Sequence, residues 1–140
     1  MAHDSGCIFC KIVAGQIPCW KVYEDEVVLA FLDIGPLVRG HTLVIPKEHH
    51  STLLEAPSKL LGEVGQRLPK IAQAVLAATG AKACHILVNN GAEAQQSVAH
   101  LHYHILPRIS GDAFHIPWNA GTLDKQTAAE LAAKVAKNIK

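Results

Sequence analysis

The feature that most constrains this chain is a run near residue 100 in which histidine alternates with apolar residues. Such alternation, with a period of two, is typical of a β-strand, whose successive side chains point to opposite faces. The sequence therefore predicts a strand over 99–108 with its histidines toward a cleft and its apolar residues in a core. The run reads Ala99, His100, Leu101, His102, Tyr103, His104, Ile105, Leu106, Pro107, Arg108.

The shared face limits what the three imidazoles can do. A strand rises about 3.3 Å per residue, so the outer two rings begin about 13 Å apart and cannot both ligate one metal ion. Close imidazoles discourage one another's protonation, so at least one should be neutral near pH 7 and available as a nucleophile or a base. The alternative, a strand that only carries polar residues on an exposed face, is weaker for three alternating histidines than for one.

Composition and length predict a single globular domain. The chain has 140 residues, of which 49% are hydrophobic and 18% charged, with a formal net charge of +1. This length allows one sizeable core, which we place at about residues 7–110 of a domain spanning 1–140, with a tail over 111–140. The low net charge without a basic cluster argues against nucleic acid as a partner and leaves small anionic ligands open.

The first six residues lack the basic-then-apolar pattern of a secretory signal, and no apolar run is long enough to span a bilayer. We therefore expect a cytoplasmic protein with no membrane partner. In that compartment the four cysteines are better explained by metal binding or burial than by disulfides.

The hydrophobic pattern predicts strands before and after one long helix. Apolar residues recur every three or four positions over 58–79, which predicts an amphipathic helix that Pro69 kinks or divides and Gly80 ends. A further helix is predicted over about 124–138. The other strands are predicted over 19–24 and 27–32, as a hairpin, and over 41–46 and 85–89.

Several residue types invite a binding role, each with an ordinary structural alternative. Cys7 and Cys10 have the spacing of half a zinc site, although a redox pair or coincidence gives the same pattern, and His49 or His50 could complete the site or lie exposed in a loop. Asp33, at a strand end, could bind a ribose hydroxyl or form a turn. The apolar residues near Cys10 form either a wall of a pocket or plain core: Ile8, Phe9 and Ile12.

The run from His100 to Leu106 resembles the signature of the histidine-triad (HIT) family. The likeness extends to the Cys-x-x-Cys pair and to the stretches 30–34, 40–49 and 89–91. It implies an α+β domain, with a five-stranded antiparallel sheet, one main helix and a C-terminal helix. It also implies a homodimer with a ten-stranded sheet.

The resemblance implies a nucleotide hydrolase that cleaves at the α-phosphorus of purine nucleoside phosphoramidates through a nucleotidyl-histidine intermediate. A dinucleoside polyphosphate hydrolase and a low-turnover nucleotide-binding or interaction protein remain as alternatives, as does a hydrolase with catalytic zinc at the triad.

By position, the resemblance assigns catalysis to the triad and one further histidine. His102 attacks, His104 assists the leaving group, His100 orients His102, and His41 supports the cluster. Structural zinc is implied as a cofactor, held by Cys7, Cys10, His49 and His100. The implied nucleotide-binding residues are Ile8, Phe9, Ile12, Asp33, Ile34, Asn89, Ser97, His102 and His104.

One position departs from the family pattern. Gln95 stands where relatives usually have glycine, before Gln96 and Ser97. If the backbone there needs a positive φ, glutamine fits less well than glycine. We therefore expect this departure to affect substrate affinity more than the chemistry.

Overall fold

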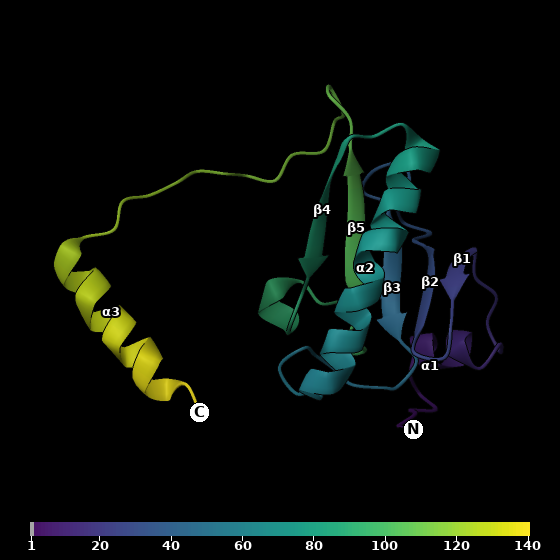
Figure 1. Cartoon of the computed structure of the whole chain (residues 1–140), viewed down its shortest axis with the longest axis horizontal. Helices are drawn as coiled ribbons and strands as arrows, with labels where there is room; N and C mark the ends of the chain where they lie inside the picture. Colours follow the sequence, from purple (N-terminus) through teal and green to yellow (C-terminus); the bar gives the residue numbers. More distant parts are fainter. Residues whose placement is uncertain (1) are drawn as a thin grey trace.

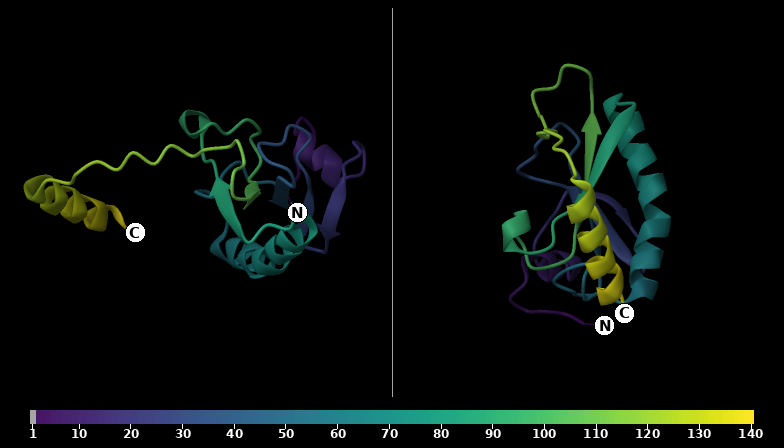
Figure 2. Two further views of the ribbon diagram at one scale, coloured as in Figure 1. Left: turned by 90° about the horizontal axis from the view of Figure 1, so that it is seen from above. Right: turned by 90° about the vertical axis from the view of Figure 1, so that its left-hand side faces the viewer.

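The structure, a computed structural model, describes residues 2–140 and confirms an α+β domain built on an antiparallel five-stranded sheet. The strand order is β1-β2-β3-β5-β4, with α2 across one face and α1 against the other (Figures 1 and 2). The elements are α1 (Ile8–Val13), β1 (Lys21–Glu24), β2 (Val28–Leu32), β3 (Thr42–Pro46), α2 (Ser58–Thr79), β4 (Ala83–Val88), η1 (Ala92–Ala94), β5 (Tyr103–Arg108) and α3 (Lys125–Asn138).

The central strand β3 is buried on both faces because each face supports a separate core. Val44 packs in the core beneath α2, whereas Leu43 and Ile45 pack in the core that includes Phe9 of α1. Strands covered on both faces are apolar at successive positions, which accounts for the continuous apolar run in this part of the sequence.

The helix predicted over 58–79 is present with those bounds, and Pro69 does not divide it. Val64, Ile71 and Val75 form its buried stripe, and Gly80 ends it in the left-handed conformation that glycine adopts readily. The amphipathic pattern therefore located the layer that covers the sheet.

The histidine run differs from its prediction in one respect, because the strand begins at Tyr103 rather than near residue 99. The Leu101 N–H donates to the carbonyl oxygen of His50 at 2.7 Å, instead of to a neighbouring strand. The apolar side chains that alternate with the histidines are nevertheless buried together in the core beneath α2, as predicted: Leu101, Tyr103 and Ile105.

Beyond β5 the chain leaves the body as an extended segment that leads to α3 (Figures 1 and 2). Trp118 is 85% exposed, so it does not anchor this segment on its own domain. Among the helices of residues 2–140, none combines the length and the apolarity needed to cross a membrane.

Candidate functional site

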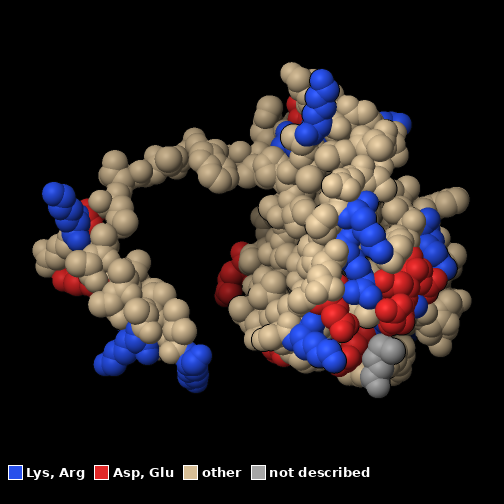
Figure 3. Space-filling view, viewed as in Figure 1, with Lys and Arg blue, Asp and Glu red and all other residues tan. Residues whose placement is uncertain are grey.

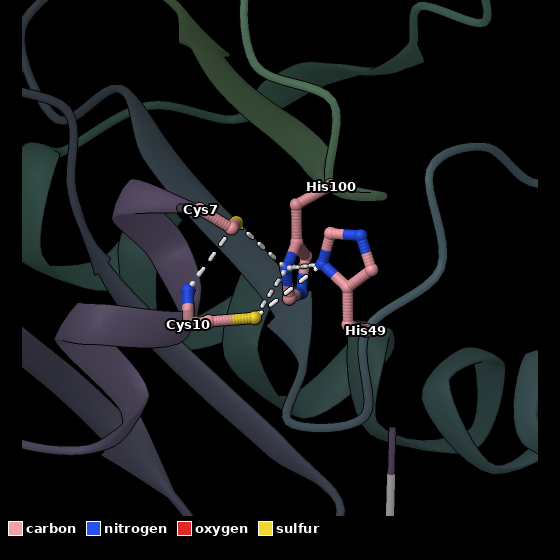
Figure 4. Close-up of side chains that lie close together, drawn as sticks. All are labelled: Cys7, Cys10, His49 and His100. Carbon is pink, nitrogen blue, oxygen red and sulfur yellow. Dashed lines mark hydrogen bonds between the residues drawn. The ribbon is translucent and has the colours of Figure 1, made fainter. Parts of the chain in front are cut away.

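Two thiols and two imidazoles converge at the start of α1, the end of β3 and the segment before β5 (Figure 4). His100 Nδ1 lies 3.4 Å from Cys7 Sγ, 3.6 Å from Cys10 Sγ and 3.1 Å from His49 Nδ1. Tetrahedral zinc with ordinary bond lengths would separate its ligand atoms by about 3.3 to 3.8 Å. The four donor atoms, all within 4.8 Å of one another, therefore fit a zinc ion.

Hydrogen bonds around this cluster orient its thiol and imidazole groups for metal binding. His100 Nε2 lies 2.9 Å from the carbonyl oxygen of Pro46 and must donate to it, which leaves the lone pair on Nδ1. Cys7 is the N-cap of α1, and its Sγ accepts from the Cys10 N–H at 3.4 Å. The first turn of α1 thus holds both thiols toward the histidines.

Burial favours the uncharged forms of two members of this cluster, His100 and Cys10. Desolvation lowers the pKa of His100 to about 4, and desolvation also raises the pKa of Cys10. A dication would compensate the thiolates, so the charge requirement as well as the geometry of the donor set fits zinc.

His102 is buried beside the cluster, and its backbone neighbour fixes its tautomer. Its Nδ1 lies 2.6 Å from the carbonyl oxygen of His100, so Nδ1 carries the hydrogen and donates it. In the neutral ring the lone pair is then on Nε2. The Phe9 ring packs edge-on against this imidazole, with the centroids 5.2 Å apart.

A second chain of hydrogen bonds fixes the tautomer of His104. The Leu37 N–H donates to His41 Nδ1 at 3.1 Å, so the hydrogen of a neutral His41 is on Nε2. That nitrogen lies 2.8 Å from His104 Nδ1, which accepts, so His104 carries its own hydrogen on Nε2. Within residues 2–140, His104 Nε2 is the one buried side-chain nitrogen or oxygen without a hydrogen-bond partner.

Burial keeps both of these rings neutral. Desolvation, reinforced by the neighbouring histidines, lowers the pKa of His104 to about 4. Desolvation also lowers the pKa of His41, although Asp33, with Oδ2 3.5 Å from His41 Nε2, acts in the opposite direction. His104 therefore presents a neutral N–H donor.

His102 and His104 line a cavity of about 260 Å³, here called the main cavity. Its other polar lining residues include Asp33 and Ser97. Its apolar lining includes the residues singled out in the sequence: Ile8, Phe9, Ile12 and Ile34. A mostly apolar lining with a few polar groups is the usual form of a small-molecule site.

His104 also borders a second cavity, of about 380 Å³, which the sequence did not indicate. Asn89 and Gln95 supply amide groups there, and the extended segment after β5 contributes Phe114 and Ile116. Asn89 therefore faces this cavity rather than the one lined by Asp33 and Ser97. Its lining comes from five separate stretches of the chain that share no sequence pattern.

The structure separates the alternatives that the sequence left open at two positions. His49 belongs to the four-residue cluster, whereas His50 Nε2 lies 2.9 Å from Glu48 Oε1. Cys19, expected to be a buried thiol, is half-buried and lines the main cavity.

Gly40 precedes His41 with φ +88, and a Cβ there would lie 2.5 Å from Thr79 Cγ2. Glycine is therefore required where this backbone passes close to the end of α2.

Basic and acidic side chains are interspersed on the face of the body shown in Figure 3. Lys47 pairs with Glu24 at 2.9 Å, and Arg67 pairs with Asp25. Among the described residues, the lining of the main cavity includes no lysine or arginine. An anionic group bound there would therefore have no lysine or arginine of this lining as its counter-ion.

Comparison with known proteins identifies the family of this chain. The model of the HIT domain matches residues 14–111. The protein Hit of Bacillus subtilis is 44% identical over 136 residues, covering 95% of this chain and 94% of the relative. The adenosine 5'-monophosphoramidase Hnt1 of Schizosaccharomyces pombe is 36% identical over 135 residues, covering 96% and 98%.

An adenylylsulfatase of Arabidopsis thaliana is 46% identical over 109 residues. The match covers 78% of this chain, but it spans only 55% of the plant protein's length.

Solved structures agree. A Streptococcus mutans protein of 45% identity superposes with a TM-score of 0.96, covering 99% of this chain and 88% of its own. Because this match covers 99% of the chain, it includes the C-terminal segment after β5 as well as the sheet. A zinc-bound histidine triad family protein of Mycobacterium smegmatis, 36% identical, has a TM-score of 0.73, covering 94% of each chain.

The signature histidines thus lie on a fold shared almost completely with solved relatives, and the family model accounts for more than two thirds of the sequence. From these matches we conclude that the chain belongs to the HIT family.

Proposed function

We propose that this protein hydrolyses purine nucleoside phosphoramidates at the α-phosphorus, through a nucleotidyl intermediate on His102. The observation that carries the proposal is the 2.6 Å hydrogen bond from His102 Nδ1 to the His100 carbonyl oxygen, which leaves the Nε2 lone pair for attack. The names of two relatives, an adenosine 5'-monophosphoramidase and an adenylylsulfatase, support a nucleotide hydrolase.

In the first step His102 Nε2 attacks phosphorus, and the bond from phosphorus to the leaving nitrogen breaks. The ring becomes positively charged as the new bond forms, and the His100 carbonyl oxygen stabilises that charge through the Nδ1 hydrogen. His104 Nε2–H faces no protein acceptor among the described residues, so it can donate a hydrogen bond to the departing nitrogen, which takes its proton from solvent.

In the second step water attacks the same phosphorus, and the bond to His102 Nε2 breaks. The products are the free nucleoside monophosphate and the restored neutral imidazole, and the proton of water passes to solvent. Two displacements of moderate difficulty thereby replace one difficult displacement.

In the main cavity we place the nucleotide with its base against the apolar lining residues. Ile8 and Ile34, 47% and 89% exposed, lie where a bound base would cover them, with Phe9 and Ile12 behind. Asp33 Oδ1 accepts from the Gly35 N–H at 2.8 Å, and its second oxygen remains for ribose hydroxyls. Ser97 and Asn89 line the two cavities on either side of His104 and are placed for phosphate or leaving-group contacts.

We assign zinc a structural role, with Cys7, Cys10, His49 and His100 as ligands. When bound, it would hold α1 and the segment after β3 against His100. Because His100 supplies the carbonyl that positions His102, this cluster orients the nucleophile and leaves Nε2 of His102 free.

The homodimer implied by the family resemblance is part of the proposal. β4 is an edge of the sheet, and Ile86 on it is 44% exposed. Two β4 strands paired across a two-fold axis would give the expected ten-stranded sheet, because edge strands present unpaired backbone groups.

The decisive experiment is mass spectrometry of a reaction quenched with base, with adenosine 5'-phosphoramidate and a diadenosine polyphosphate offered separately. We expect a nucleoside monophosphate adduct on the peptide containing His102, formed faster from the phosphoramidate. His102→Ala should abolish the adduct and turnover and retain nucleotide binding. Turnover that survives in His102→Ala would refute the nucleophile, and faster adduct formation from the polyphosphate would refute the substrate class.

A further inference from the structure

A groove adjoins the main cavity at its apolar lining residues. It has a volume of about 200 Å³ and is lined by Pro18, Cys19, Trp20 and Ile34. Three of these residues, Pro18, Cys19 and Ile34, also line the main cavity, so the two hollows are continuous along the chain that they share. Trp20 lines the groove and not the main cavity, and we call this hollow the Trp20 groove.

Trp20 is fixed through its backbone, but its own chain leaves its ring uncovered. Its carbonyl oxygen accepts from the Leu32 N–H at 3.0 Å, which extends the pairing of β1 with β2 by one residue. Trp20 is 72% exposed, and Ile34 beside the groove is 89% exposed. Large apolar side chains grouped at the mouth of a cavity are typical of a surface that a ligand covers.

The Trp20 groove lies near the edge of the sheet that is farther from β4. Trp20 directly precedes β1, which is the edge strand opposite β4, and α1 lies beside β1 (Figures 1 and 2). A second copy paired along β4 would therefore leave this groove open to a ligand.

The two linings show which part of a nucleotide can reach the groove. Asp33, Ser97 and the histidines line the main cavity but not the groove, so the groove is separate from the positions that we assign to ribose and phosphate. Ile34, against which we place the base, lines both hollows. A group that enters the groove is therefore attached to the base. In a purine, the carbons of the six-membered ring that carry substituents point away from the sugar.

The chemistry of the groove selects an apolar group. The four residues that line it carry no charge, and an indole ring offers a broad face on which an aromatic or aliphatic group can pack. The main cavity, at about 260 Å³, is also slightly smaller than the about 300 Å³ at which small-molecule sites usually begin. A ligand that extends into the groove would gain the additional volume.

We propose that the Trp20 groove is a subsite for an apolar substituent on the six-membered ring of the purine base, with the substituent packed on the indole of Trp20. This inference rests on the nucleotide orientation of the proposed function, and it extends the substrate class to nucleotides with a modified base.

The first test is isothermal titration calorimetry with two nucleoside monophosphates, so that binding is measured without turnover. The probes are adenosine 5'-monophosphate and 6-benzylaminopurine riboside 5'-monophosphate, which differ by one benzyl group. We expect the wild type to bind the benzyl nucleotide about fivefold more tightly or better, the scale of one aromatic contact. A wild type that binds the benzyl nucleotide no more tightly than the parent would overturn the subsite.

Three variants locate the source of this preference. Trp20→Ala should bring the ratio of the two dissociation constants near one, and Trp20→Phe should retain most of the preference because it keeps an aromatic face. Trp118→Phe is the matched control, because Trp118 is also an exposed tryptophan but lines neither the main cavity nor the groove. The wild-type ratio in Trp20→Ala would overturn the assigned contact.

The second test uses Trp118→Phe alone and leaves the groove unaltered. This variant retains Trp20 as its single tryptophan, so its fluorescence reports on the groove. We expect the benzyl nucleotide to shift the emission to shorter wavelength as the ring loses water, and an unchanged spectrum at saturation would overturn the subsite. Both tests are independent of the reaction: the expected preference without an adduct on His102 would refute the proposed hydrolysis alone, whereas an adduct without the preference would refute the subsite alone.

Discussion

The Nε2 atom of His41 lies 2.8 Å from Nδ1 of His104, and this contact decides which nitrogen of His104 carries its hydrogen. His41 is in turn fixed by the backbone N–H of Leu37. A ring outside the lining of both cavities thereby fixes the hydrogen of a donor that lines them.

Removing the His41 donor should weaken turnover more than binding. In His41→Ala, His104 is free to move its hydrogen to Nδ1 and to lose the donor at Nε2. We expect kcat to fall about tenfold or more, the scale of one hydrogen bond of about 1.4 kcal/mol, with little change in KM. Steady-state kinetics on adenosine 5'-phosphoramidate measure this.

His41→Gln is the matched control, because its amide can still donate toward His104. It should recover part of the lost kcat. If His41→Ala altered only KM, His41 would be a binding residue and not a positioning residue.

The buried histidines predict how stability changes with pH. The pKa of His104 is about 4 in the folded protein, below its ordinary value of about 6.5, so the unfolded chain binds more protons between these values. The contribution of His104 to the free energy of unfolding should therefore be largest above about pH 6.5 and should decrease as the pH drops toward 4. Urea denaturation across this range measures the slope, and His104→Asn should reduce it; an unchanged slope would remove His104 as its source.

Loss of one thiol from the zinc cluster should lower both the zinc content and the stability of the protein. We expect Cys10→Ser to lower the zinc content from one ion per chain and to destabilise the fold by at least about 2 kcal/mol, seen as a Tm lower by several degrees. Cys84→Ser is the control, because Cys84 packs against the other core and lies outside the cluster. Full zinc content in Cys10→Ser, measured by elemental mass spectrometry, would contradict the assigned ligands.

Gln95 is the one residue other than glycine with a positive φ in residues 2–140, at 65°. The glycine expected from the family pattern would relieve this strain, so Gln95→Gly should stabilise the protein by about 1 kcal/mol. Gln96→Gly should act in the opposite direction, because the Gln96 amide joins Gly91, Ser51 and Val98. Chemical denaturation of both variants tests the difference in sign.

Sequence patterns located the elements that bury an apolar face. α2 has the predicted bounds because its stripe and Gly80 are local signals, and the four strands predicted before the histidine run are present within a few residues of their expected positions. The start of β5 was misplaced because the Leu101 N–H bonds to the His50 carbonyl oxygen, a choice made by distant backbone.

The site was only partly visible in the sequence, for a similar reason. Spacing and family resemblance named the histidines and the thiols that the structure brings together, and their roles remain predictions. The hydrogen positions on His41 and His104 depend on a backbone N–H at Leu37, which no side-chain pattern encodes. The second cavity could not be anticipated, because Phe114 reaches it only through the path of the extended segment after β5.

The placement of β5 between β3 and β4 has a consequence for biosynthesis. β5 is the last strand to emerge from the ribosome, yet it occupies an interior position and joins its two neighbours. A nascent chain that stops before residue 103 would hold β4 with no partner in the sheet and would expose the edge of β3. His102 immediately precedes β5, so a product truncated at that point would contain this residue without the completed sheet that holds it in place.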